Sequence, residues 1–316
     1  MALFLRGLTA GGPGLTWKAA PPDPGAETKL FTGEQSNTNL QIGPDHLLKI
    51  YRKLVAGPGL DGEVLGALSG SGVTPALIGL WRADDLDLDL GLCCQRIKDG
   101  QDGWDWARAA SRASRPVGPQ LAQLGQALRR LHQLLAQAFP TDRLDAAEVG
   151  RRIRWRFDLA AAELPEVAAL RLGLERVLGR LDPEAVPVQR LHGDFHLGQA
   201  LISPDGWTII DFEGEPLKTP AERRGLDSPW RDVAGLLRSI DYARRSHSEP
   251  DSTVAVAWAA DARRGFLEGY LGPAGAPPPL LAAYEADKAV YELVYETRNR
   301  PGWADLPRRA LAGLLG

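Results

Sequence analysis

Five leucines spaced three and four residues apart form the clearest pattern in the chain. They are Leu121, Leu124, Leu128, Leu131 and Leu135. This spacing places their side chains on one side of a helix, so it predicts an amphipathic helix with a buried stripe. Other segments predict further helices over 151–162, 166–181, 228–245, 252–272 and 277–298. Beyond about residue 100 the chain is therefore predicted to be mainly helical.

The first hundred residues have a different pattern, in which short strand-like runs alternate with turns rich in glycine and proline. The runs lie at 2–6, 15–19, 76–81, 86–97 and on either side of a turn within 29–52. A short helix that carries Glu63 is predicted after Pro58-Gly59, because an apolar face can form from Val64, Leu65 and Leu68.

The order of these elements predicts an α+β protein with two lobes. We expect a small lobe with an antiparallel sheet over 28–98 and a larger helical lobe over 99–316. Residues 1–27 are expected to form a hairpin or a loose arm. Within the helical part, a strand-loop-strand segment is predicted over 188–213.

The composition is that of a globular chain of about two domains, with 316 residues, 44% hydrophobic and 24% charged. A net charge of −3 argues against nucleic-acid binding by bulk charge. No apolar run reaches the ~18 residues that span a bilayer, so no membrane partner is expected. The only cysteines, Cys93 and Cys94, are adjacent, which favours a reducing compartment. The opening residues do not read as a signal peptide, so a cytoplasmic location is expected.

Two short segments carry most of the chemical information. The first reads HGDFHLGQ over 192–199, and the second reads DFEGEP over 211–216. A turn at Pro204-Asp205-Gly206 would bring the chain back as a hairpin, so polar side chains of the two segments can converge on one site.

Phosphoryl transfer needs a base that orients the attacking hydroxyl and oxygen ligands that hold Mg²⁺ against the phosphates. Asp194 is the candidate base. Gln199, five residues later, and Asp211, a further twelve residues on, are the candidate metal ligands. Any one of these residues alone is more often structural, and it is the three together that favour a catalytic site.

With these motifs the chain resembles the aminoglycoside-phosphotransferase-like kinases, whose catalytic loop reads His-Gly-Asp with an amide five residues later. Within that superfamily it is similar to the maltokinases, which also have glutamine at the position of Gln199. The resemblance covers roughly residues 28–305 and is carried by HGDFHLGQ, DFEGEP, GEQSNTN (33–39), SPWRDVAGLLRSIDYA (228–243) and KAVYELVYETRNRPGW (288–303). The resemblance implies a protein kinase-like fold and an enzyme that uses ATP and Mg²⁺.

A nucleotide site is expected in the sheet lobe. By composition the segment 33–39 reads as an ordinary polar hairpin, but the resemblance implies a phosphate-binding loop that includes Gln35, Ser36, Asn37 and Thr38. Lys49 lies on a predicted strand and could be a surface lysine of an edge strand. We favour a lysine that contacts the phosphates while Glu63 orients it. The hinge that binds adenine is expected at Gln95 and Ile97.

Recognition of the phosphate acceptor is expected from the helical lobe. From spacing alone, the helix over 277–298 reads as a solvated helix with ion pairs four residues apart. The resemblance instead implies substrate contacts from Lys288, Tyr291, Glu292 and Arg298. His196 either contacts the substrate or packs within the loop. His132 is interpreted as a packing histidine, and Asp232 and His192 as residues that brace the catalytic loop.

The resemblance implies an enzyme that phosphorylates maltose at its anomeric hydroxyl, in α-glucan or glycogen metabolism, with a functional link to a trehalose synthase-type enzyme. One alternative is another sugar or aminoglycoside kinase of the superfamily, such as a glucosamine kinase, whose cationic substrate would require more acidic groups in the pocket. A second alternative is a non-catalytic nucleotide-binding protein that keeps the fold.

Overall fold

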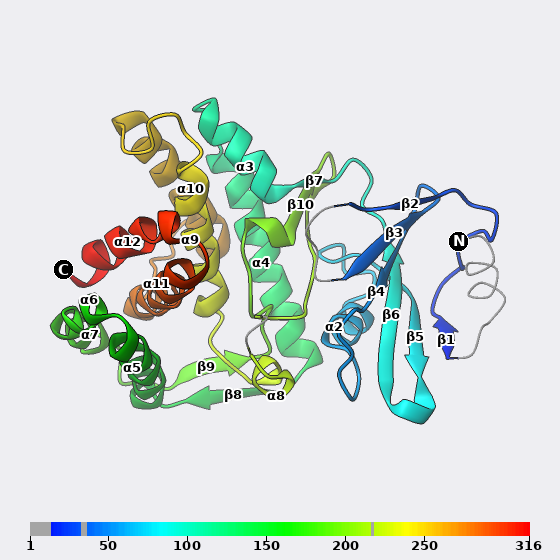
Figure 1. Cartoon of the computed structure of the whole chain (residues 1–316), viewed down its shortest axis with the longest axis horizontal. Coiled ribbons are helices and arrows are strands. Elements are labelled where there is room, and N and C mark those ends of the chain that lie inside the picture. Colours follow the sequence, from blue (N-terminus) through cyan, green and yellow to red (C-terminus); the bar gives the residue numbers. More distant parts are fainter. Residues whose placement is uncertain (1–13, 33–36, 216–217) are drawn as a thin grey trace. The chain divides into compact units, whose positions relative to one another are not determined.

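A computed structural model describes residues 14–32, 37–215 and 218–316 of the chain. They form two units, and the chain passes between them three times (Figure 1). The first unit comprises the residues up to Asp102 together with Gln199–Arg224, and the second comprises Gly103–Gly198 and Gly225–Gly316. The observed fold is α+β, with an antiparallel sheet in the first unit and mainly helices in the second.

The sheet of the first unit has six strands in the order β1-β5-β6-β4-β3-β2, and all neighbouring strands are antiparallel (Figure 1). The strands are β1 Leu15–Trp17, β2 Thr28–Leu30, β3 Thr38–Ile42, β4 His46–Ile50, β5 Leu77–Ala83 and β6 Leu88–Gln95. One face of the sheet buries a core of Leu40, Ile42, Leu48 and Cys93. The strands predicted over 29–52, 76–81 and 86–97 are confirmed.

The amino-terminal segment adds a strand to this sheet. Leu15 is paired with Trp81 in the register of β1 and β5. The expected hairpin partner at 2–6 lies outside the described residues. Helix α2, Leu60–Ala67, buries Val64 and Leu65, and Leu68 directly after it is also buried, as the apolar spacing predicted; Leu60 at its start is buried as well.

The predicted hairpin after the catalytic segment is present, and it belongs to the first unit. Strands β10, Ala200–Ser203, and β11, Gly206–Ile209, are joined by Pro204-Asp205, and β10 also pairs with β7, Gln101–Asp102. The Ile209 N–H donates to the Val73 carbonyl at 2.8 Å, which ties the hairpin to the first unit. The segment 199–224, which was expected within the helical lobe, is thus grouped with the first unit, and these backbone hydrogen bonds are the reason.

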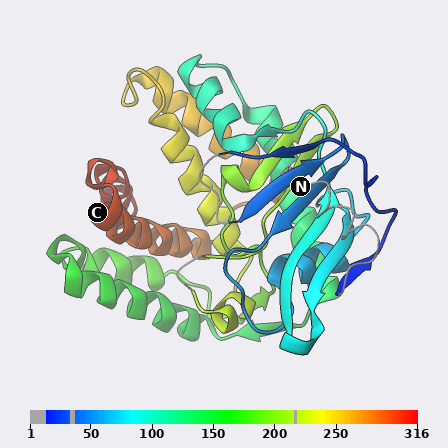
Figure 2. The same ribbon diagram turned by 45° about the vertical axis from the view of Figure 1, so that its right-hand side comes forward.

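The second unit is built from helices, many of which the sequence predicted (Figures 1 and 2). Its longer helices are α3 Gly103–Arg112, α4 Gly118–Ala138, α5 Ala146–Glu163, α9 Trp230–Arg244, α10 Thr253–Leu271, α11 Pro279–Asn299 and α12 Asp305–Leu315. All five leucines of the predicted stripe on α4 are buried. Among the described residues, no helix is long and apolar enough to cross a bilayer.

Several short elements differ from the expectation. The helix predicted over 166–181 is divided into α6 Pro165–Ala168 and α7 Arg171–Leu178, and neither proline nor glycine marks the break at Ala169–Leu170. The sequence also did not indicate α3, α12, the two-residue β7, the short helix α8 Pro220–Arg224, or strand β8 Thr141–Leu144. The strand expected at the start of 188–213 is observed as β9 Val186–Gln189, which pairs with β8. Strand β8 is mostly exposed, so it lacks the apolar alternation that announces a strand.

Helices α4 and α10 approach so closely that their backbones touch. A Cβ atom added at Gly269 would lie 1.9 Å from the Ala122 carbonyl oxygen, and one added at Gly125 would lie 2.2 Å from the Phe266 carbonyl oxygen. Only glycine leaves room for this contact. The two helices also carry His132 and Tyr270, which take part in the loop network described below.

Replacing Gly269 with alanine is therefore expected to force α4 and α10 apart and to reduce the free energy of unfolding by about 1–3 kcal/mol. Gly313→Ala is the matched control, because no atom lies within 4 Å of the added Cβ. Alanine at this exposed position on α12 is expected to be neutral or stabilising by up to ~1 kcal/mol. Urea unfolding measures the free energy of unfolding of both variants. Equal effects at the two positions would contradict the proposed backbone contact.

Candidate functional site

A buried lysine surrounded by carboxylates lies at the centre of the first unit's polar residues. The Lys49 Nζ atom on β4 lies 2.8 Å from Asp61 Oδ2, 2.7 Å from Asp211 Oδ1 and 2.5 Å from Glu213 Oε1. Burial alone would lower the pKa of Lys49, but the three carboxylates outweigh it and hold that pKa well above its ordinary value. Lys49 is therefore a permanently charged cation.

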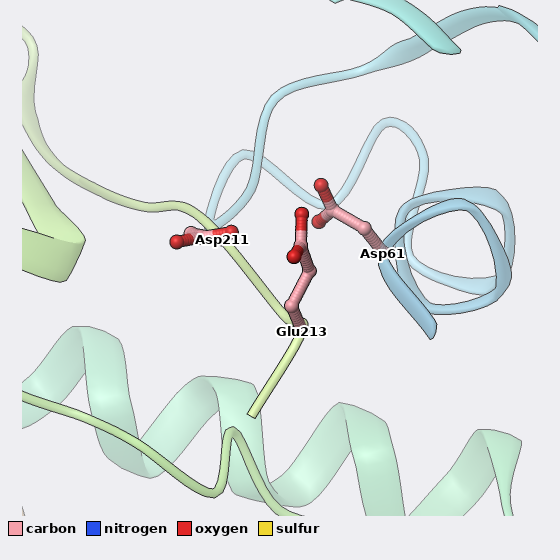
Figure 3. A group of neighbouring side chains, drawn as sticks. All are labelled: Asp61, Asp211 and Glu213. Carbon is pink, nitrogen blue, oxygen red and sulfur yellow. The ribbon is translucent and has the colours of Figure 1, made fainter. Parts of the chain in front are cut away.

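The three carboxylates come from two elements that are distant in sequence. Asp61 lies in the first turn of α2, and Asp211 and Glu213 lie in the segment that follows β11 (Figure 3). The second oxygen of Asp61 accepts a hydrogen bond from the Phe212 N–H at 3.1 Å. One buried carboxylate thus ties together β4, α2 and the segment 211–213.

The expected pairing of Lys49 with Glu63 is corrected by this geometry. The acid that pairs with Lys49 on α2 is Asp61, whereas Glu63 Oε2 lies 3.4 Å from Arg224 Nη2. Two residues apart on a helix, the acids face different directions, and the sequence does not reveal which of them faces the sheet. A role for Glu63 in nucleotide binding stays a prediction.

The same carboxylates can hold a metal ion. Asp61, Asp211 and Glu213 each offer an oxygen within 4.8 Å of the others. With Lys49 beside them the group has two negative charges in excess, which fits a divalent cation, and Mg²⁺ prefers oxygen ligands. Burial raises the pKa of Glu213, against the influence of Lys49, and a bound cation would favour its charged form. Glu213 was not singled out as a ligand from sequence, although it lies in the DFEGEP motif.

The hairpin β10–β11 brings Gln199 beside Asp211. The Gln199 Nε2 atom donates to Asp211 Oδ2 at 3.2 Å. Asp211 has a φ of 65°, a left-handed conformation that is uncommon outside glycine and is typical of functional sites. The two side chains are therefore close together, as predicted. That they bind a metal ion stays a prediction.

The other residues predicted to bind nucleotide have mixed surroundings. Gln35 and Ser36 lie outside the described residues. Asn37 is buried and its Nδ2 donates to Glu213 Oε1 at 2.5 Å, so it joins the acidic group. The Thr38 hydroxyl accepts from Arg52 Nε at 3.0 Å.

The predicted hinge lies where β6 ends. The backbone N–H of Gln95 donates to the Ala76 carbonyl at 2.8 Å. This backbone donor therefore already has an acceptor within the first unit. Ile97 follows the strand and is half-buried. Adenine binding by this segment stays a prediction.

In the second unit, a buried aspartate holds the catalytic segment. Asp232 on α9 accepts hydrogen bonds from the backbone N–H groups of His192 at 2.9 Å and Gly193 at 3.0 Å, and its Oδ2 lies 3.1 Å from His132 Nε2. His132 Nδ1 in turn lies 2.8 Å from the Tyr270 hydroxyl. Burial would raise the pKa of Asp232, but His132 and these donors lower it. Both expectations, a satisfied His132 and a bracing Asp232, are confirmed.

The loop also holds itself through its histidines. The Asp194 N–H donates to His192 Nδ1 at 3.4 Å, and the Gly198 N–H donates to His196 Nδ1 at 3.1 Å. The expectation that His192 holds the loop backbone is confirmed. One ring nitrogen of His196 is used inside the loop, and its contact with a substrate stays a prediction.

The candidate base has a cationic neighbour. The Lys288 Nζ atom on α11 lies 3.4 Å from Asp194 Oδ1 and 5.0 Å from the centre of the Tyr291 ring. Tyr291 stacks on Tyr295, with ring centres 6.4 Å apart. The structure thus brings Asp194 together with two of the four residues predicted on this helix.

Glu292, the third, is half-buried beside Arg238, an arginine to which the sequence analysis gave no role. Arg238 Nε lies 2.9 Å from Glu292 Oε2, and Arg238 Nη1 lies 2.9 Å from Asp241 Oδ2. Burial raises the pKa of Glu292, while Arg238 and Lys288 oppose the rise. Arg238 lay within a segment that carried the resemblance, but its spacing gave no sign of a partner on another helix.

Arg298, the fourth, is not brought into this group. It is exposed and pairs with Glu163 on α5, with Nε 2.8 Å from Oε1. It also lies ten residues beyond Lys288, which is about 15 Å along a helix. Substrate contact by Arg298 stays a prediction without support from this geometry.

Known proteins are similar to this chain in sequence. Residues 27–278 match the family model described as the phosphotransferase enzyme family. A glucosamine kinase of Streptacidiphilus jiangxiensis is 33% identical over 248 residues, which are 68% of this chain and 55% of that relative. The chain thus matches just over half the length of this relative. A glucosamine kinase of Mycolicibacterium smegmatis is 30% identical over 324 residues, 90% of this chain and 79% of the relative.

Solved structures agree with these matches. A glucosamine kinase in complex with glucosamine, ADP and inorganic phosphate superposes with a TM-score of 0.78 at 25% identity, covering 100% of this chain and 82% of the other. A second crystal form of a glucosamine kinase gives a TM-score of 0.79 at 26% identity, covering 100% and 84%. The fold is that of the phosphotransferases with which the chain superposes. The chain belongs to the phosphotransferase enzyme family of the aminoglycoside-phosphotransferase-like kinases.

Asp232→Ala is expected to leave three buried donors without an acceptor and to reduce the free energy of unfolding by about 3–5 kcal/mol at pH 7. The folded-state pKa of Asp232 is lowered. Its contribution is therefore complete above the unfolded pKa of about 3.9 and is lost as the pH falls through the folded pKa. Denaturant unfolding of wild type and variant from pH 7 down to acid should show the difference narrowing. Asp251→Ala, at an exposed aspartate, is the control and should change the midpoint little.

Proposed function

We propose that the protein is an ATP-dependent sugar kinase whose acceptor is an amino sugar of the glucosamine type. In this reaction a sugar hydroxyl oxygen attacks the γ-phosphorus of ATP, the bond from that phosphorus to the β,γ-bridging oxygen breaks, and ADP leaves. The hydroxyl proton is accepted by a carboxylate. Such transfer depends on positioning and charge stabilisation more than on covalent chemistry.

The first unit supplies the groups that handle phosphate and metal. Lys49 neutralises phosphate charge and is held in place by Asp61. Asp211, Gln199 and Glu213 are the residues that would hold Mg²⁺, since they offer carboxylate and amide oxygens in one place. When bound, the metal neutralises the charge that develops on the phosphate oxygens.

The second unit supplies the base. Asp194 accepts the proton of the attacking hydroxyl, and the hydrogen bonds from the loop to Asp232 fix its backbone. The ammonium group of Lys288 lies beside the Asp194 carboxylate, 3.4 Å from its Oδ1 atom. The observation that carries the proposal is this braced, lysine-paired aspartate on a chain of the phosphotransferase family.

The charges around Asp194 favour a cationic acceptor. Acidic and basic side chains alternate in a series that runs from it through Lys288, Glu292, Arg238, Asp241, Arg263 and Glu285. The series holds four acidic groups against three basic ones, and the ammonium group of an amino sugar would favour the ionised form of its acids and balance the excess. Similarity to two glucosamine kinases supports the same choice.

Maltose is the competing acceptor. The stacked pair Tyr291 and Tyr295 offers aromatic surface of the kind that packs on neutral sugar rings, and Tyr295 is exposed. Phosphorylation of maltose would connect the protein to glycogen synthesis and to a trehalose synthase-type enzyme. The excess negative charge has no function in binding a neutral sugar, so we place this reading second. A nucleotide-binding protein without catalysis is the third.

Incubation with ATP, Mg²⁺ and each of glucosamine, maltose, glucose and kanamycin tests the proposal. ADP release is expected to be fastest with glucosamine, and NMR of the product identifies the phosphorylated hydroxyl. Asp194→Asn is expected to lower kcat about 10²–10⁴-fold, because the general base is lost while the shape is kept. Preferred turnover of maltose would replace the amino sugar by the competing acceptor. Nucleotide binding without any sugar-dependent ADP release would overturn the assignment of a kinase.

The correction on α2 gives a separate test. Asp61→Asn removes one charged partner of Lys49, so KM for ATP is expected to rise roughly tenfold or more. Glu63→Gln removes a partly exposed ion pair with Arg224 and is expected to change KM for ATP by less than about threefold. Steady-state kinetics at saturating acceptor measures both. A larger effect at Glu63 than at Asp61 would restore the pairing expected from sequence.

A further inference from the structure

We infer that Arg238 is a positioning residue, which acts through Glu292 and together with Asp241 sets the charge and the place of that carboxylate in the acceptor region. The role of Glu292 toward an acceptor rests on the proposed function. The control of Glu292 by Arg238 does not, because it is carried by contacts within the second unit.

Arg238 is among the most deeply buried charged residues described, with 2% of its surface exposed. Its guanidinium donates one hydrogen bond to Glu292 Oε2 from Nε at 2.9 Å and one to Asp241 Oδ2 from Nη1 at 2.9 Å. Its Nη2 lies 2.9 Å from Glu292 Oε2 as part of the ion pair, without a hydrogen bond of its own. The guanidinium carbon also lies 5.9 Å from the centre of the Tyr242 ring. A rigid planar fork held on three sides fixes the position of the carboxylate that it binds.

This arrangement reaches the candidate base through one helix. Glu292 lies one helical turn beyond Lys288 on α11, and Lys288 lies 3.4 Å from Asp194. Residues four apart on a helix are neighbours, so the charge of Glu292 acts on the same lysine that faces the base. If Glu292 became neutral, Lys288 would lose one neighbouring counter-charge, and the acceptor region would lose one site for a cation.

The charge of Glu292 is contested by the groups around it. Arg238 and Lys288 favour its ionised form. Burial and the nearby Asp241 favour its neutral form, and the hydroxyl of Tyr242 on α9 lies close enough for Glu292 to raise the pKa of that tyrosine. The next charges in the series are Arg263 on α10, which pairs with Asp241, and Glu285 on α11, which pairs with Arg263.

Removing Arg238 and removing Asp241 should therefore shift the pKa of Glu292 in opposite directions. Arg238→Met deletes a favourable cation, so the pKa of Glu292 rises. Asp241→Asn deletes an unfavourable anion, so the pKa of Glu292 falls. A role of Arg238 in packing alone predicts neither movement nor the change of sign.

The test follows the Glu292 carboxyl directly by NMR in protein labelled with ¹³C at the glutamate δ-carbon. Glu292→Gln assigns the resonance. Arg238→Met is expected to shift its titration upward by about one pH unit or more, which is about a tenfold change in proton affinity. Arg238→Lys should give a smaller upward shift, and Asp241→Asn a downward one. An unmoved titration in Arg238→Met, or an upward movement in Asp241→Asn, overturns the inference.

Arg156→Met is the matched control for a general loosening of α11. Arg156 on α5 binds Asp287 on α11 through two hydrogen bonds of 2.7 and 2.8 Å, one residue from Lys288 and away from the Arg238 contacts. It should leave the titration of Glu292 in place. An equal shift in this control would mean that any disturbance of α11 moves Glu292. If Arg238→Met does not fold, Arg238→Lys and Asp241→Asn still test the inference, because they are expected to shift the pKa of Glu292 upward and downward, respectively.

Kinetics separates this inference from the proposed function. In the enzyme with glucosamine, Arg238→Met is expected to raise KM for the sugar about tenfold, to leave KM for ATP within about threefold, and to move the acid limb of kcat/KM to higher pH. A wild-type protein without glucosamine-dependent ADP release would refute the proposed acceptor, while the NMR titration would still decide the role of Arg238. A wild-type kinase whose pH profile is unchanged in Arg238→Met would refute the inference alone.

Discussion

The first unit depends on one buried cation, the ammonium group of Lys49. A charge of this kind is costly away from water unless opposite charges surround it, and removing a partner from such a group is destabilising by several kcal/mol. Three carboxylates from two distant segments meet that requirement. They also leave negative charge in excess, so the same group that neutralises the lysine can receive a divalent ion.

In both units a buried carboxylate accepts hydrogen bonds from the backbone of an irregular segment. In the first, Asp61 on α2 accepts the N–H of Phe212 and fixes the segment that carries Asp211. In the second, Asp232 on α9 accepts two N–H groups of the catalytic segment. In both cases a buried carboxylate on a helix satisfies backbone donors of an irregular segment, which would otherwise lack partners.

Sequence predicted those parts of the protein that depend on local pattern. The α4 leucine stripe, the strands around Lys49 and the Pro204-Asp205 turn follow from periodicity and turn chemistry, and the HGDFHLGQ and DFEGEP motifs led to the family. Contacts between distant segments were not accessible. Nothing in the spacing distinguishes Asp61 from Glu63, or shows that Arg238 meets Glu292, because these pairs depend on how helices face one another. The choice between a neutral and a cationic acceptor was not accessible for the same reason, since it depends on the balance of charge among several helices.

The division of the chain into units has a consequence for how the protein is made. The strands around Lys49 leave the ribosome early. Asp211 and Glu213 follow only after residues 103–198, which belong to the second unit, have been synthesised. Until then the nascent sheet carries a lysine with only one of its three acids, Asp61, available. Domains usually complete folding in order during translation. Here the earlier unit must wait for a later piece of chain, so its final closure is coupled to synthesis of its neighbour.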